Sequence, residues 1–146
     1  MSSFPASLVT PERVVFEAEV QSVMLRTAEG EAAFLPGHTA LIGALVPGVV
    51  RFQQENGTEE RAAVHGGFVQ VAPDHVVVLA PMAELAGEID VARAERALEE
   101  AGRRLAELGG RPAAGEETSG EAGLERAEAA DAERRARVRL DVAGGS

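Results

Sequence analysis

The residues with the clearest chemical potential lie in the stretch IDVARA at 89–94. Asp90 and Arg93 are three positions apart, so in a helix their side chains lie on one face. The spacing alone favours a helix N-cap with a surface ion pair, worth about 0.3–1 kcal/mol. Near the C-terminal end, Arg135 and Arg139 are four positions apart, so in a helix they also share one face.

Other chemistry is poorly supported. The three histidines, at 38, 65 and 75, are dispersed among predicted strands, and no cysteine or carboxylate spacing completes a cage, so we expect no metal site. Gly66-Gly67 opens no helix, as a phosphate-binding loop must, and a strand bulge or close packing explains it better. The serines lack the nucleophile-elbow pattern. The sequence therefore predicts a protein that is not an enzyme.

Composition narrows the function further. The chain has 146 residues, no cysteine, 3% aromatic residues and a net charge of −10, and every positive charge is an arginine. This balance argues against nucleic-acid binding, which requires a basic face. The apolar runs are too short to cross a bilayer, and the first residues do not resemble a signal peptide, so we expect a cytoplasmic protein without membrane insertion.

The composition of the chain changes near residue 88 and divides the elements expected to position these residues into strands and helices. Residues 1–87 predict short strands, with Asn56-Gly57 as a hairpin turn. The run DHVVVLA at 74–80 is typical of a strand buried on both faces, and the prolines and glycines of FLPGHTALIGALVPG at 34–48 indicate turns. The pattern favours a small antiparallel sandwich or barrel.

Residues 88–146 predict two helices, at about 90–108 and 121–140, with a flexible loop over 109–120. Asp90 is the expected N-cap of the first helix and Gly109-Gly110 its end. The apolar face of the second helix is thin, with Leu124, Val138, Leu140 and many alanines. Because such a face buries little area, we expect a weakly held helical hairpin.

Four blocks in order resemble the epsilon subunit of the F-type ATP synthase: LVTPERVVFEAEV at 8–20, TAEGEAAFLPGHTALIGALVPGVVRF at 27–52, VHGGFVQVAPDHVVVLA at 64–80 and EIDVARAERALEEAGRRL at 88–105. The resemblance implies an all-β N-terminal sandwich of about ten antiparallel strands followed by a C-terminal α-helical hairpin. It also implies a non-catalytic rotor subunit on the cytoplasmic face of a bacterial plasma membrane. Its partners would be the gamma subunit, the c-ring and the alpha/beta catalytic head.

The same resemblance assigns roles to individual residues. Glu31 and His38 stand at the family's ring-contacting positions. No cofactor is required, but a weakly bound regulatory ATP is implied at Glu84, Ile89, Asp90, Arg93, Ala94, Arg135 and Arg139. Glu100 replaces an arginine of the strong ATP binders, which predicts weak affinity. An extended second helix would bind the catalytic head through its arginines and inhibit ATP hydrolysis, acting as a brake. These arginines are Arg126, Arg134, Arg135, Arg137 and Arg139.

A free-standing ATP-sensing or adaptor module with the same sandwich and helical hairpin is the alternative hypothesis. A rotor subunit should co-purify with the gamma subunit, whereas an adaptor should not. The sequence analysis therefore predicts a protein whose work is binding and regulation under either hypothesis.

Overall fold

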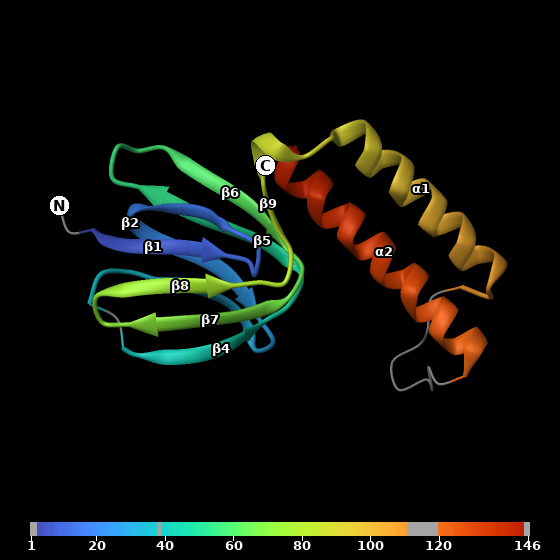
Figure 1. The fold of residues 1–146 in the computed structure, drawn as a ribbon, viewed down its shortest axis with the longest axis horizontal. Helices are drawn as coiled ribbons and strands as arrows, with labels where there is room; N and C mark the ends of the chain where they lie inside the picture. The colour runs from blue at the N-terminus through green and yellow to red at the C-terminus, as the bar shows by residue number, and fades with distance from the viewer. Residues whose placement is uncertain (1–2, 38, 111–119, 145–146) are drawn as a thin grey trace.

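The computed structural model describes residues 3–37, 39–110 and 120–144. These residues form nine strands, a short 3-10 helix and two α-helices (Figure 1). Their bounds are β1 Phe4–Val9, β2 Val14–Thr27, β3 Gly30–Phe34, β4 Leu41–Leu45, β5 Gly48–Gln54, β6 Glu59–Val64, β7 Gly67–Ala72, β8 His75–Leu79, β9 Ala83–Leu85, η1 Ala86–Glu88, α1 Val91–Glu107 and α2 Glu121–Ala143.

The strands build a sandwich in which β2 belongs to both layers. The first half of β2 pairs with β1, followed by β8, β7 and β4, and its second half pairs with β3 and β5, followed by β6 and β9. Because β2 runs unbroken for 14 residues through both layers, the described strands number nine rather than about ten. Among the described strands every pair is antiparallel except β1–β8, which is parallel.

The predicted β-turns are confirmed. Asn56-Gly57 joins β5 to β6, with Gly57 at a φ of 88° and the Asn56 side chain accepting from the Thr58 N–H at 2.9 Å. Pro36-Gly37 forms a turn after β3, with Gly37 at a φ of 81°. Both glycines adopt left-handed angles that other residues reach only with strain. Local sequence therefore decides where these strands end.

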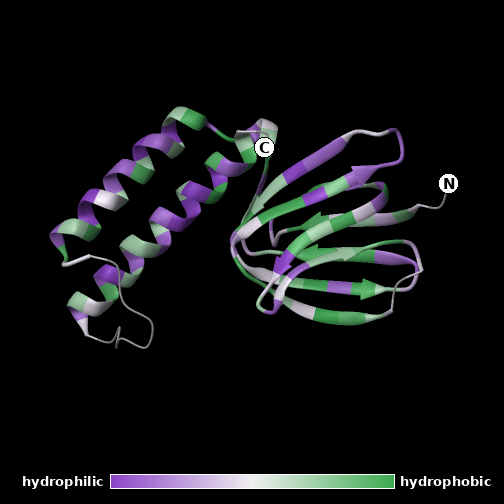
Figure 2. Ribbon diagram, turned by 180° about the vertical axis from the view of Figure 1, so that it is seen from behind, coloured by the Kyte–Doolittle hydropathy of each residue, from purple (hydrophilic) through white to green (hydrophobic). Residues whose placement is uncertain are grey.

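The core of the sandwich is built from the inward-facing residues of all nine described strands. Val20, Val23 and Phe52 are fully buried, and the Phe52 ring lies 4.7 Å from the ring of Phe16. Figure 2 shows that the strands carry most of the hydrophobic residues, whereas hydrophilic residues dominate both helices. This distribution fits an independent sandwich core and a helical hairpin with few apolar contacts.

The helical hairpin touches the sandwich through α2. In Figure 1 the C-terminal end of α2 lies beside β6, β9 and η1, while α1 packs on α2 away from the strands. Between the helices, Leu105 packs on Ala129 and Ala130. Leu124, expected on the apolar face, is 62% exposed. The apolar face of α2 was thus assigned wrongly at its N-terminal end, because burial there depends on α1 and not on residue type.

The described helices differ slightly from the predicted ranges. Asp90 is the N-cap of α1 as predicted, and α1 ends at Glu107, before Gly109 at a φ of 95° and Gly110 at a φ of 90°. α2 continues to Ala143, three residues beyond the predicted end. Most of the predicted loop over 109–120 lies outside the described residues.

Candidate functional site

A pocket of about 290 Å³ opens at the junction of β9, the start of α1 and the C-terminal part of α2. Its lining residues are Glu84, Glu88, Asp90, Arg93, Ala94, Ala97 and Arg139. The structure thus brings together five of the residues named for nucleotide binding, although they are spread over more than fifty positions of sequence. Glu100 does not line this pocket. We call this site the junction pocket.

Asp90 holds the start of α1 in place. Its Oδ1 accepts from the backbone N–H of Arg93 at 3.1 Å, which confirms the N-cap. The side chains of Asp90 and Arg93 form no ion pair with each other in the described structure, so the predicted surface pair is wrong. The carboxylate is engaged by the helix backbone, and the Arg93 side chain is left exposed at the junction pocket.

Glu84 and Arg139 join β9 to α2. The Arg139 Nε–H donates to Glu84 Oε1, and the same oxygen lies 3.8 Å from His65 Nε2. Burial lowers the pKa of His65 from 6.5 to about 4, and the positive charge of Arg139 acts in the same direction. The positive charge of Arg135 also lowers the pKa of His65. His65 was considered in the sequence only as a metal ligand, so its place at this junction was missed.

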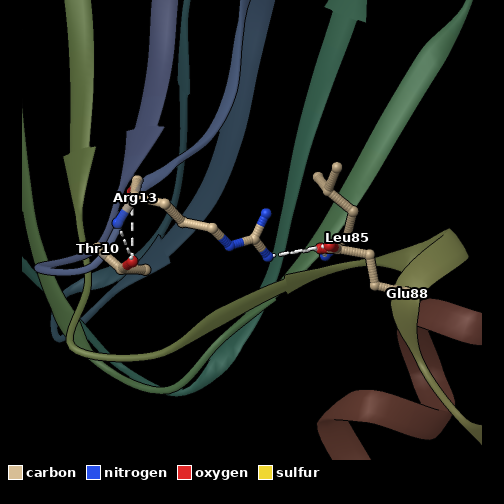
Figure 3. A network of polar contacts seen from close by, with 4 residues as sticks. All are labelled: Thr10, Arg13, Leu85 and Glu88. Atoms are coloured by element: carbon tan, nitrogen blue, oxygen red, sulfur yellow. Dashed lines mark hydrogen bonds and ion pairs between the residues drawn. The ribbon is translucent and has the colours of Figure 1, made fainter.

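Glu88 is a second residue that the sequence analysis missed. Its Oε1 accepts from the Leu85 N–H at 3.0 Å, and both carboxylate oxygens lie 3.0 Å from Arg13 Nη2 (Figure 3). The backbone hydrogen bond from Leu85 and the charge of Arg13 lower the pKa of Glu88. Because Arg13 follows β1, this carboxylate ties the link between sandwich and helices to the β1–β2 turn.

Ile89 does not line the junction pocket. It is buried with Ala63, Val138 and Val142 in a small apolar cluster between β6, the link and α2. This cluster is the hydrophobic part of the contact between sandwich and helical hairpin. The structure therefore gives Ile89 a packing role.

Four of the five arginines assigned to an extended second helix have partners within this chain. Arg126 donates to the Gly110 carbonyl at 3.2 Å, Arg134 lies 2.6 Å from Asp131, Arg137 lies 3.8 Å from Glu133, and Arg139 pairs with Glu84. Glu133 is a charged residue buried between the helices. Any external contact by these arginines requires exchange of these internal partners.

Glu31 lies near the start of β3, 3.7 Å from Arg26 on β2. Pro36-Gly37 follows the other end of the strand, so Glu31 and this turn are separated by most of the length of β3. Glu31 instead lines a pocket of about 210 Å³ together with Val138 and Asp141 of α2. His38 lies outside the described residues.

One outer face of the sandwich exposes apolar side chains. Ile42 on β4, Phe68 on β7 and Leu79 on β8 are 75%, 56% and 44% exposed, and strand pairing puts Phe68 directly beside Leu79. Ala44, beside Phe68 in β4, continues this surface, which we call the outer apolar face. The prediction that residues 74–80 are buried on both faces is wrong for the single chain, because only the inward residues of β8 are buried.

The described residues contain no group of three His, Asp or Glu side chains placed to hold a metal ion. Neither described helix is long and apolar enough to span a membrane. The fold and the sites define a two-part protein: a sandwich with an exposed apolar face, and a helical hairpin docked on it beside a charged pocket.

Comparison with known proteins agrees with this class. Residues 3–86 match the model of the ATP synthase delta/epsilon chain β-sandwich domain, and residues 88–144 match that of the long α-helix domain of the same chain. The chain therefore belongs to the ATP synthase delta/epsilon chain family. It is 44% identical over 144 residues to the ATP synthase epsilon chain of Moorella thermoacetica, covering 99% of this chain and 98% of that one. It is 52% identical over 100 residues to that of Desulforudis audaxviator, covering 68% and 72%.

Solved structures share the fold. A chain of the Euglena gracilis mitochondrial ATP synthase OSCP/F1/c-ring structure superposes with a TM-score of 0.76 at 23% identity, covering 98% of this chain and 82% of that one. A chain of the Tetrahymena thermophila mitochondrial ATP synthase central stalk/c-ring structure gives 0.58 at 15% identity, covering 97% of both. The sequence interpretation as an epsilon subunit and the predicted sandwich-plus-hairpin fold are thus confirmed.

Proposed function

We propose that this chain is a non-catalytic central-stalk subunit that couples the c-ring to the gamma subunit of a proton-translocating F-type ATP synthase and restrains ATP hydrolysis. Residues 1–87 would bind gamma and the c-ring, and residues 88–146 would regulate the alpha/beta head. The subunit would sit peripherally on the cytoplasmic face of a bacterial plasma membrane. Membership of the epsilon chain family and the two-part structure support this proposal.

The outer apolar face is the observation that supports the proposed contact with gamma. Soluble monomers rarely expose contiguous apolar surface without a partner. The valine-rich sequence of β8 is typical of a strand buried on both faces, yet Leu79 is 44% exposed in the single chain. Beside Phe68, a hollow of about 560 Å³ extends this face. A helical shaft with apolar side chains would bury these residues, and gamma is the partner we assign to them.

The c-ring contact is assigned to Glu31 and His38. Glu31 is exposed and carries a negative charge that suits Arg or Gln side chains on the ring loops. Its partner within the chain, Arg26, lies at 3.7 Å, and both side chains are largely exposed. This ion pair therefore contributes little to stability, and Glu31 can exchange Arg26 for a partner on the ring.

The brake is assigned to α2. In the docked state Arg139 pairs with Glu84 of the sandwich, whereas Arg134 and Arg137 pair with acidic residues of α2 itself. Undocking would free Arg139 for acidic surfaces of the catalytic beta subunits, and the other two arginines would exchange their partners there. The docked state is held by a small apolar cluster and by the Glu84–Arg139 pair. Because so few contacts hold it, a modest binding energy elsewhere is enough to shift the balance.

The junction pocket is assigned to a weakly bound regulatory ATP. Its volume of about 290 Å³ is at the lower end of small-molecule sites, which span about 300–1,000 Å³. Three carboxylates face it beside two guanidiniums, and phosphates would have to take Arg139 from Glu84. Weak ATP affinity follows from this exchange of partners and from the negative charge of Glu88 in the pocket. Glu100 does not line the pocket. Calorimetry with millimolar ATP should show heat that Arg93→Ala abolishes.

Co-purification with gamma tests the main proposal. Phe68→Ser should weaken gamma binding by about 30-fold or more, the loss of about 2 kcal/mol typical of a central interface residue. Met24→Ser is the matched control, because Met24 is 43% exposed on the opposite layer. Equal gamma binding by both variants and the wild type would contradict the assigned face. A wild-type chain that does not co-purify with gamma at all would favour the adaptor hypothesis instead.

Removal of residues 111–146 tests the brake. ATP hydrolysis by the reconstituted complex should rise while synthesis is largely retained, because the arginines of α2 are gone. Hydrolysis that stays at the level of the intact complex would show that the helical hairpin does not restrain this enzyme.

A further inference from the structure

His65 is buried at the contact between the sandwich and the helical hairpin. It follows β6, its backbone N–H donates to the Met82 carbonyl at 3.4 Å, and its side chain is only 4% exposed. Neither ring nitrogen has a hydrogen-bond partner in the described part of the chain. A buried polar group without a partner costs about 1–3 kcal/mol, and such a group needs an explanation.

Charged groups face this imidazole from both elements packed against it. Glu84 approaches from β9, and Arg135 and Arg139 approach from α2. One oxygen, Glu84 Oε1, is shared: it accepts from Arg139 Nε and lies 3.8 Å from His65 Nε2. A neutral His65 leaves this carboxylate to Arg139. A protonated His65 would compete for the same oxygen and would repel both arginines of α2.

We propose that His65 is a proton-sensitive latch for the docked helical hairpin: the neutral ring permits docking of α2, and protonation of the ring releases α2 from the sandwich. The release step moves one proton from solvent onto the imidazole and exposes the resulting cation. Undocking also removes Arg135 and Arg139, so the protonated ring gains Glu84 as a partner without competition from these arginines. This latch concerns the conformation of the subunit and does not depend on its role as a brake.

The direction of the pH effect follows from proton binding. In the docked state the pKa of His65 is about 4, compared with an ordinary value of 6.5 for a solvated ring. The docked state therefore binds fewer protons, so docking is fully favoured above pH 6.5 and weakens as the pH falls from there towards 4. At about pH 5.5 the ratio of undocked to docked chains should be roughly tenfold higher than at neutral pH.

Energy transfer between two dyes in the full chain tests this latch. The chain contains no cysteine, so Glu55→Cys at the β5–β6 turn and Glu107→Cys at the end of α1 provide two exposed labelling positions. Mild urea brings the docking equilibrium into the measurable range while the sandwich stays folded. Lowering the pH from about 7.5 to about 5.5 should raise the undocked-to-docked ratio about tenfold.

Two histidine variants separate the latch from a general acid effect. His65→Gln should abolish the dependence on pH, whereas His75→Gln should keep it, because His75 is half-exposed and pairs with Asp74 at the β7–β8 turn. His65→Asn serves if the Gln variant does not fold. NMR titration of the unmodified chain adds a readout without substitution: the His65 ring should stay neutral well below pH 6.5 while docked. Docking unaffected by pH, tightened by acid, or equally pH-sensitive in His65→Gln would overturn the latch.

Discussion

Truncation of Val142 should loosen the helical hairpin without affecting the sandwich. Val142 is fully buried near the end of α2, in the cluster with Ala63, Ile89 and Val138. Val142→Ala removes two buried carbons, worth about 0.8 kcal/mol each, and leaves a cavity that adds a further penalty. We expect the free energy of docking to fall by about 2 kcal/mol, which raises the undocked-to-docked ratio about 30-fold.

The assay is the urea dependence of energy transfer between dyes at Glu55→Cys and Glu107→Cys, combined with circular dichroism of the sandwich. Leu124→Ala is the matched control, because Leu124 lies on the same helix but is 62% exposed. It should change the docking free energy by less than about 0.5 kcal/mol, as exposed substitutions usually do.

Two outcomes would refute this reasoning. If Val142→Ala and Leu124→Ala shift the docking midpoint equally, the cluster around Val142 does not hold the helical hairpin. If Val142→Ala lowers the stability of the sandwich by the same amount, sandwich and hairpin unfold as one cooperative unit. The second result would also contradict a sandwich core that is independent of the helices.

Two further predictions concern the sandwich and its link to the helices. Gly67→Ala should prevent stable folding or lower the free energy of unfolding by several kcal/mol, because the added Cβ would lie 2.1 Å from the Leu79 carbonyl oxygen. Gly66→Ala is the control: Gly66 is also at positive φ but in open space, so this change should cost only about 1–2 kcal/mol. Equal thermal melts for both variants would contradict the close contact at Gly67. Glu88→Gln should lower stability by about 0.5–1 kcal/mol at neutral pH through loss of the exposed pair with Arg13. Because the folded state lowers the pKa of Glu88, its contribution to stability is present above pH 4.5 and disappears as the pH falls below that value. The stability difference between wild type and variant should therefore vanish in acid. A difference that persists there would contradict the ion pair.

Local sequence determined much of the architecture. Asn56-Gly57, Pro36-Gly37 and the Asp90 cap each act within a few residues, because backbone angles and capping hydrogen bonds involve near neighbours. The spacing of apolar residues changes near residue 88, and this local change separated the predicted strands from the predicted helices. The four blocks that resemble the epsilon chain were also readable from the sequence, and the comparisons confirm the family.

Residue type alone did not determine which face of an element is covered. Alternation in β8 was hidden by its run of valines, because β-branched residues suit either face of a strand. Leu124 fits an apolar helical stripe, but it is exposed because neither α1 nor the sandwich reaches that position. Val142 lies beyond the predicted helix end, yet it is fully buried because α2 continues onto the sandwich.

Only the tertiary structure decided the charged contacts at the junction. Arg13 and Glu88 are 75 positions apart, and Glu84 and Arg139 are 55 apart. No periodicity connects residues at such separations, since their pairing depends on how the chain folds back on itself. His65 shows this most clearly: in sequence it is an isolated histidine between two strands, and its burial and its shared neighbour Glu84 arise only when α2 docks on the sandwich.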